Sequence, residues 1–176
     1  MAVQNATIVA VVGEGAAEVI DGLGALRGVD ALKLGDSDAE GTERISASHG
    51  TYVVHDADPL AHVAHAWVEF FDDRSTGGTL ELEIETALTA FARGERVMPD
   101  YYVVLDPESL EPTWRHWWFG ALASHGSRRV VPQPAAVGSV RRLLRQLPTG
   151  PGWVSPAEWL PGLEFTLPDR QRLVGE

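Results

Sequence analysis

Five short apolar runs, spaced along the chain, constrain the fold more than any other feature of this sequence. Residues 6–12 (ATIVAVV) and 101–105 (YYVVL) are continuously apolar and rich in β-branched or aromatic side chains, as is typical of strands buried on both faces. The other predicted strands are residues 29–34, 51–55 and 129–132. Segments with helical character separate the strands, and this alternation predicts a parallel sheet with helices on both faces.

The first unit of the alternation is the clearest. Residues 15–27 place apolar side chains at helical spacing and end near Gly28, so strand, glycine turn, helix and strand follow one another. We therefore expect a single α/β domain over residues 1–147, with a three-layer open, mostly parallel sheet of the Rossmann-like or flavodoxin-like class. Residues 148–176 are rich in proline, and an irregular C-terminal arm is predicted there. The side chains expected to pack the arm onto the domain are Trp153, Trp159, Leu160 and Phe165.

The intervening segments differ in clarity. Residues 111–125 and 137–147 are predicted helices, whereas residues 35–50 are polar and turn-rich. In residues 60–71, Pro59 favours a helix at the start, but the β-forming side chains of the second half leave helix and strand both open. Residues 79–93 fit a strand by alternation, yet their Ala-rich end favours a helix from about Thr79, capped by Thr76 or Thr79.

Composition and charge exclude several classes of function. The chain has 176 residues and a net charge of −11, so duplex nucleic acid is not an expected partner. No apolar run approaches a membrane span, and no signal peptide is predicted. The absence of cysteine excludes thiolate chemistry and is compatible with a cytoplasmic location, which we expect. Two histidines three residues apart, His62 and His65, lack an HExxH pattern, so neither a metal nor a cofactor is predicted.

Ligands of open parallel sheets bind beyond the carboxyl ends of the strands. At those ends the sequence places Gly13, Glu14, Gly15, Asp56 and Asp106, which we therefore predict to contact a ligand. A dinucleotide fingerprint is not predicted, because its third glycine is replaced by an acid, Glu18. The arginines of the C-terminal third are interpreted as a solvated helix face. They are Arg129, Arg141, Arg142 and Arg145.

The middle of the chain carries a family resemblance. Gly78-Thr79, then Glu83-Ile84-x-x-Ala87, then Gly94-Glu95-Arg96-Val97 resembles the nucleoside 2-deoxyribosyltransferase-like group and, more loosely, the glycine-rich loop of cytokinin-activating phosphoribohydrolases. The match covers residues 78–97 and departs from the pattern at two places, and the N-terminal strand also lacks the family's Gly-Pro ending. Leu82 occupies the position of the family's glutamate, so Glu83 fits only with one inserted residue, and Glu85 replaces a glycine.

The resemblance implies a nucleoside or nucleotide ligand and hydrolysis or transfer at its N-glycosidic bond. Glu83 would be the catalytic nucleophile, and Asp72 or Asp73 would hold the sugar or the base. Gly78 and Thr79 would belong to the ligand loop. Such chemistry is physically reasonable, because cleavage of the bond builds positive charge on the sugar, which a carboxylate stabilises or captures. The alternative is that the glutamates of this segment form the solvated side of a helix.

A non-enzymatic interpretation remains open beside the enzymatic one. The aromatic segment with Trp114, Trp117 and Trp118 is either core packing, a wall on which a base stacks through Trp117, or a subunit interface. In the last case the protein would be a ligand-binding or regulatory domain that uses its Trp-rich helix as an interface, with a homodimer as the expected assembly.

The enzymatic interpretation predicts that Glu83→Ala abolishes base release, because the nucleophile is lost. The fold should stay intact, because alanine is tolerated at an exposed position of a helix. Base release from a panel of purine and pyrimidine nucleosides, with circular dichroism as the check on folding, measures this. Full activity of the variant would contradict the role of Glu83.

Overall fold

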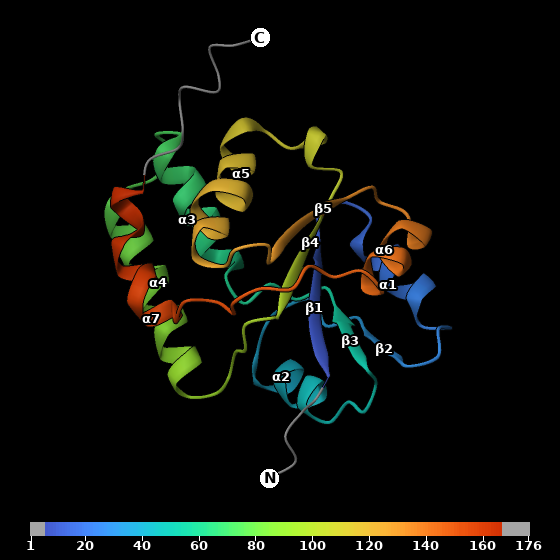
Figure 1. Ribbon diagram of the computed structural model, residues 1–176. Helices are drawn as coiled ribbons and strands as arrows, with labels where there is room; N and C mark the ends of the chain where they lie inside the picture. Colours follow the sequence, from blue (N-terminus) through green and yellow to red (C-terminus); the bar gives the residue numbers. More distant parts are fainter. Residues whose placement is uncertain (1–5, 167–176) are drawn as a thin grey trace.

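An all-parallel sheet of five strands forms the centre of the computed structural model, which describes residues 6–166 (Figure 1). The strands are β1 (Thr7–Val12), β2 (Val29–Leu32), β3 (Tyr52–His55), β4 (Tyr101–Leu105) and β5 (Val130–Gln133). All five predicted strands and the open three-layer α/β class are confirmed. The strand order, β2-β3-β1-β4-β5, differs from the 3-2-1-4-5 and 2-1-3-4-5 orders of the two folds named above.

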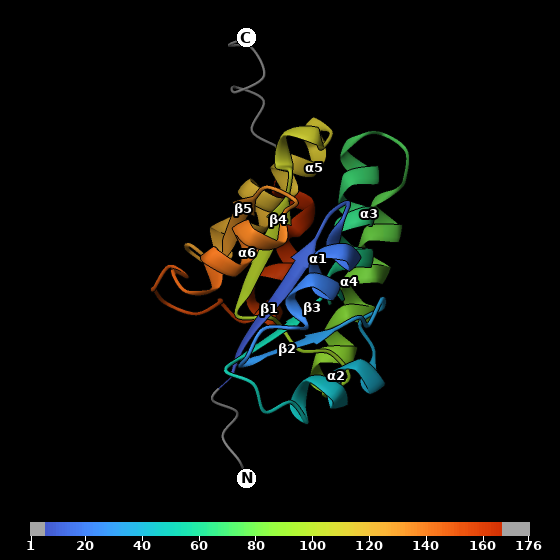
Figure 2. The same cartoon turned by 90° about the vertical axis from the view of Figure 1, so that its right-hand side faces the viewer.

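Helices cover both faces of the sheet (Figure 2). One face carries α1 (Ala16–Leu23) and α6 (Val137–Leu144), which pack with Val9 and Val11 of β1. The opposite face carries α2 (Ala39–Ser46), α3 (Ala61–Phe71) and α4 (Gly77–Ala92). The alternate side chains of β1, Ile8 and Ala10, point to this second face and join its clusters. Burial on both faces explains why the strands are continuously apolar.

The two segments that the sequence left between helix and strand are both helices. α3 and α4 pack against each other, and α4 is the outer of the pair (Figure 1). α4 begins two residues before Thr79, with Thr76 at the N-cap position, and Gly94 follows its end with φ of 69°. The buried stripe of α4 is the predicted helical one, including Leu80 and Ile84. The acidic mid-chain segment is therefore one side of an amphipathic helix.

The single helix predicted over residues 111–125 is divided into three parts. α5 (Pro112–His116) continues into a π-helical turn, η2 (Trp117–Leu122), and then a short 3₁₀ turn, η3 (Ala123–His125). Within η2 the adjacent Trp117 and Trp118 are both buried, at 0% and 6% exposure. The wider π turn accompanies the burial of two neighbouring indoles on one side of the segment. Tyr102 and Trp67 contact these rings.

Helix α2 was not predicted, because residues 35–50 are mostly polar. Asp38 caps the helix, and its Oδ1 accepts a hydrogen bond of 2.7 Å from the backbone N–H of Gly41. A single apolar side chain, Ile45, anchors α2 on the sheet beside Ile8 and Val53. One buried side chain is too weak a periodic signal to distinguish a short helix from a loop.

The C-terminal arm contains α7 (Pro156–Trp159) and a 3₁₀ segment, η4 (Leu160–Phe165), and another 3₁₀ turn, η1 (Pro107–Ser109), follows β4. Trp159 and Leu160 are buried as predicted, and the indole of Trp153 donates a 2.8 Å hydrogen bond to the carbonyl of Pro99. Phe165 is 79% exposed, so the prediction that it packs down is wrong. The remainder of the predicted arm, residues 167–176, lies outside the described residues.

Within residues 6–166, no helix combines the length and the apolar character needed to cross a bilayer. At one edge of the sheet, β5 includes Pro132, which has no backbone N–H to donate.

Gly126→Ala should destabilise the protein by about 1–3 kcal/mol, because an added Cβ would lie 2.3 Å from the indole ring of Trp153, which is held by Pro99. Gly138→Ala in α6 is the matched control. A Cβ there meets nothing within 4 Å, so this variant should be neutral or slightly stabilised. Urea denaturation measures both, and equal midpoints would contradict the packing described here.

Candidate functional site

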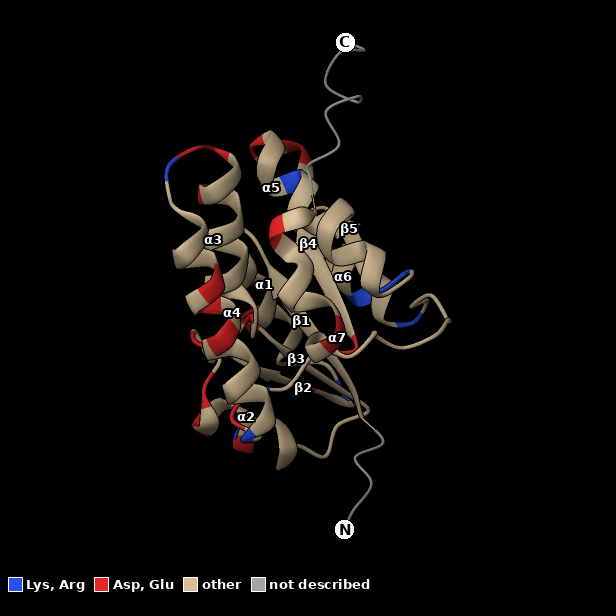
Figure 3. Ribbon diagram, turned by 90° about the vertical axis from the view of Figure 1, so that its left-hand side faces the viewer, with Lys and Arg blue, Asp and Glu red and all other residues tan. Residues whose placement is uncertain are grey.

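The predicted catalytic carboxylates lie just after α3 and on α4, in separate surroundings. Asp72, at the end of α3, accepts hydrogen bonds from the Thr113 hydroxyl at 2.6 Å and from Arg74 at 2.8 Å. Asp73 is exposed, in a left-handed conformation with φ of 58°. Glu83 is half-buried on α4, and its side chain makes no hydrogen bond or ion pair within residues 6–166. None of the three residues lines the α2–α4 groove or the arginine hollow described below, and α4, along which acidic residues recur, is an outer helix of the molecule (Figure 3).

The predicted ligand residues at the strand ends lie on neighbouring loops, where two of them support the backbone. Asp56 accepts hydrogen bonds from the N–H groups of Leu34 and Gly35, at 2.7 and 3.0 Å. Asp106 accepts one of 2.9 Å from the N–H of Ala135. Both carboxylates therefore tie adjacent βα loops together, which leaves less of each for a ligand.

The loop after β1 is shaped by close backbone approach. Gly13 has φ of 112°, and a Cβ there would lie 3.1 Å from the carbonyl oxygen of Leu105. Gly15 has φ of 86°, and Glu14 between them is exposed. The two glycines are thus required by the backbone itself, whether or not a ligand contacts them.

The remaining predicted contacts lie elsewhere. Gly78 and Thr79 are exposed in the first turn of α4. Trp117 is fully buried, and its ring centroid lies 5.7 Å from that of Trp67. A side chain without exposed surface offers neither a stacking wall nor an interface, so of the three interpretations of the Trp-rich segment the structure agrees with core packing.

A polar cluster that the sequence analysis did not predict lies where β3 ends. His55 of β3 and Tyr102 of β4 flank Ala10 of β1 at the same register position, on the face that carries α3. The hydroxyl of Tyr102 donates a 2.8 Å hydrogen bond to Oδ1 of Asp58, which also accepts one of 2.8 Å from the N–H of Leu60. Ala10 lies between the His55 and Tyr102 positions and is itself fully buried.

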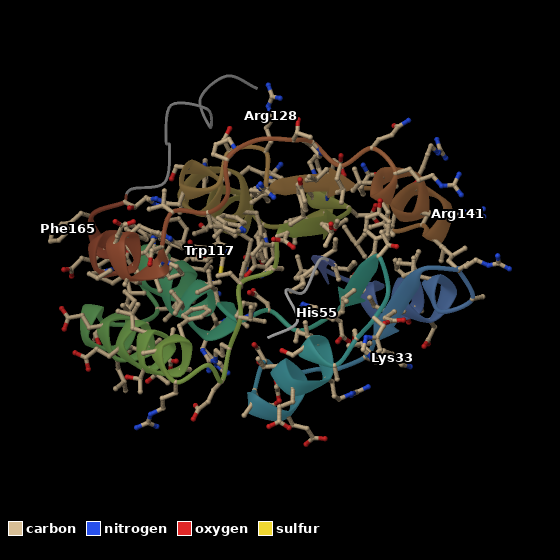
Figure 4. The ribbon with its side chains drawn as sticks, turned by 60° about the horizontal axis from the view of Figure 1, so that its bottom comes forward. Lys33, His55, Trp117, Arg128, Arg141 and Phe165 are labelled. Carbon is tan, nitrogen blue, oxygen red and sulfur yellow. The ribbon has the colours of Figure 1, made fainter. Side chains whose placement is uncertain are left out.

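His55 is 1% exposed and lies well inside the molecule (Figure 4). Its Nδ1 accepts a hydrogen bond from the N–H of Ala57, so the neutral ring carries its proton on Nε2. Nε2 has no hydrogen-bond partner within the described chain. Burial lowers the pKa of His55 to about 4, against the opposing charge of Asp56, and the ring is neutral at pH 7.

Asp58 has the opposite shift. Although part of the residue remains accessible, burial of its carboxyl group raises the pKa to about 6, against the hydrogen bonds from Leu60 and Tyr102 and the charge of Arg96. Burial and the neighbouring Asp58 carboxylate raise the pKa of Tyr102 well above its usual range. Perturbed groups that share one strand end are a physical mark of a functional site, as well as of a structural network.

A groove between α2 and α4 lies next to this cluster. We call it the α2–α4 groove; its volume is about 450 Å³ and its lining includes carboxylates, hydroxyls and two guanidinium groups. The lining residues are Ser37, Asp38, Ala39, Leu82, Glu85, Thr86, Thr89, Ala90, Arg93, Glu95 and Arg96. Arg96 connects groove and cluster, because its Nη1 donates a 3.2 Å hydrogen bond to the carbonyl of Pro59, directly after Asp58.

The groove offers both donors and acceptors. The hydroxyl of Thr86 is committed as a donor to the carbonyl of Leu82 and keeps its acceptor capacity. The side chains of Glu85 and Arg93 make no hydrogen bond or ion pair within residues 6–166, so they are available to a ligand. No group of three or more His, Asp or Glu side chains there has metal-binding geometry.

The chain, compared with protein-family models, with curated proteins and with solved structures, matches none of them. The α/β architecture by itself does not define an activity, so the side chains of the site carry the functional information.

The shifted pKa values of Asp58 and His55 predict opposing effects of pH on stability. The Asp58 pKa is raised on folding, so its contribution is fully present below about 3.8 and is lost as pH rises through about 6. The His55 pKa is lowered, so its contribution is present above about 6.5 and is lost as pH falls toward about 4.

Asp58→Asn removes the first effect and keeps the second. On acidification from pH 7 to pH 4.5 this variant should therefore lose roughly 2 kcal/mol more stability than the unmodified protein. Urea denaturation across this pH range measures the difference. Asp36→Asn, at an exposed aspartate, is the control and should follow the unmodified protein. Parallel curves for Asp58→Asn and the unmodified protein would contradict the assigned shift.

Proposed function

We propose that this protein binds a polar small molecule of the nucleoside class in the α2–α4 groove, as a ligand-binding domain that does not turn its ligand over. The observation that carries the proposal is the lining of the groove. It combines unpaired acceptors, unpaired donors and apolar surface around one volume of about 450 Å³. That volume lies within the range of small-molecule sites.

The chemistry of the lining favours a neutral ligand with hydroxyl groups. Its carboxylates, Asp38, Glu85 and Glu95, slightly outnumber its guanidinium groups, Arg93 and Arg96, so a highly charged anion gains little. Carboxylates accept hydrogen bonds from sugar hydroxyls, and guanidinium groups donate to the carbonyl or ring acceptors of a base.

An apolar surface for a flat ring is also present. Leu82 is 61% exposed and lines the groove with Ala39 and Ala90. A large exposed aliphatic side chain in a polar groove gains free energy when a ring covers it. Sugar hydroxyls, base acceptors and a planar apolar face are the three features of a nucleoside.

Binding is favoured over catalysis because the carboxylates expected to react are outside the groove. Asp72 is held by Thr113 and Arg74, and Glu83 is not part of the lining, whereas Glu85 is. Hydrolysis or transfer at the N-glycosidic bond stays a second proposal, supported by the resemblance of residues 78–97.

Thermal shift with a nucleoside panel tests the binding proposal. A nucleoside at a hundredfold excess over its Kd should stabilise the protein by about 2.7 kcal/mol and raise its Tm. Thr89→Trp should fill the groove and abolish the shift. Ala92→Trp, an exposed position of α4 outside the lining, should retain it. No shift with any nucleoside, or equal loss in both variants, would contradict the proposal.

A base-release assay on the same samples separates the two proposals. Binding without release supports the non-catalytic domain. If base release is abolished by Glu83→Ala, the enzymatic proposal is supported. If base release is abolished only by Glu85→Gln, the nucleophile is Glu85, which lines the groove.

A further inference from the structure

A second hollow lies at the opposite side of the sheet, beside α1 and α6. Its volume is about 310 Å³ and its lining contains three arginines and no carboxylate. The lining residues are Leu26, Arg27, Gly28, Val29, Thr51, Tyr52, Arg141, Leu144 and Arg145. We call it the arginine hollow.

The three guanidinium groups come from distant parts of the sequence. Arg27 belongs to the turn between α1 and β2, and Arg141 and Arg145 are one turn apart at the end of α6. Arg141 projects from α6 where this helix lies beside α1 (Figure 4). The solvated face that the sequence predicted for the α6 arginines therefore borders a hollow with a third cation.

None of the three arginine side chains has an ion pair or hydrogen bond within residues 6–166, although the chain has 25 acidic and 14 basic residues. The acidic residue nearest to Arg27 in the sequence is Asp30, on β2. Its carboxylate accepts hydrogen bonds from the N–H groups of His49 and Gly50 and does not pair with Arg27. Three unpaired like charges at one hollow repel each other, and an anion would relieve that repulsion.

The helix dipole explains part of this arrangement but not all of it. Cations in the last turn of a helix interact favourably with its C-terminus, which accounts for Arg141 and Arg142. The dipole does not account for Arg27, which comes from another segment and lines the same hollow. Arg142, by contrast, does not line the hollow.

The three arginines are exposed at the rim of the hollow, whose backbone is held in place by hydrogen bonds and core packing. The carbonyl of Gly28 accepts a 3.1 Å hydrogen bond from the N–H of Tyr52, which joins the α1–β2 turn to the start of β3. Leu144 is 3% exposed and packs in the same core cluster as Tyr52 and Leu26. The floor is therefore apolar and ordered, while the rim is cationic.

We propose that the arginine hollow binds a phosphate monoester with a small organic group. Guanidinium groups bind phosphate oxygens in a bidentate manner, and three of them match a dianion better than a carboxylate. The hydroxyl of Thr51 adds a donor. The volume exceeds that of phosphate alone, and the organic group would contact Leu144 and the ring of Tyr52.

Isothermal titration calorimetry with phenyl phosphate, and with inorganic phosphate as the fragment, tests this proposal. We expect saturable binding of phenyl phosphate that is tighter than that of inorganic phosphate and weakens with added salt. Arg27→Gln and Arg141→Gln should each weaken it at least about tenfold. Arg142→Gln removes the same charge from the same helix outside the hollow and should change affinity less than about twofold.

Flotation with phosphatidylcholine vesicles that contain phosphatidic acid separates the two sources of the ester. Vesicle binding that is lost in Arg141→Gln and kept in Arg142→Gln assigns the phosphate to a lipid headgroup. Binding of phenyl phosphate alone assigns it to a soluble ligand. The proposal is overturned if the unmodified protein shows no saturable binding at millimolar concentrations, or if Arg142→Gln is as weak as Arg141→Gln. Because the hollow is separate from the α2–α4 groove, either result leaves the nucleoside proposal unaffected.

Discussion

The methyl side chain of Ala10 is the constraint on which the interior of this protein depends. Ala10 lies on the central strand between His55 and Tyr102, at one register position of three neighbouring strands. Ala10 is fully buried, so a larger residue there would have to displace its neighbours in the core. Tyr102, at the same register position, anchors the loop after β3 on the sheet through its hydrogen bond to Asp58, and the carbonyl of the next residue, Pro59, accepts the hydrogen bond from Arg96 of the groove.

The architecture could be predicted because buried parallel strands leave an unambiguous pattern. Apart from Thr7, residues 6–12 and 101–105 are apolar, since both faces are covered, and their short length and β-branched side chains distinguish them from a buried helix. Helix α2 depends on one buried side chain, Ile45, and on the cap from Asp38, neither of which forms a periodic pattern. The division of residues 112–125 reflects competition between two neighbouring indoles for the core, which is a tertiary effect.

The candidate sites were less predictable because they depend on which polar side chain turns inward. Asp56 and Asp58 are two residues apart and look alike in the sequence, but the first caps the β2 loop and the second lies against Tyr102. Asp58 is followed by Pro59, and its carboxylate accepts a hydrogen bond from the N–H of Leu60 in a local turn, which is a common role for aspartate before proline and does not indicate burial. The arginine hollow joins residues more than a hundred positions apart, and no local pattern relates Arg27 to Arg141.

The proline of β5 has a consequence for the protein in concentrated solution. An edge strand normally exposes a row of donors and acceptors that an incoming chain can extend. At Pro132 that row lacks a donor, and its ring would obstruct an added strand. Pro132 therefore disfavours strand addition at the β5 edge. If the folded chain aggregates by strand addition, we expect this to begin at β2, the edge strand on the other side of the sheet.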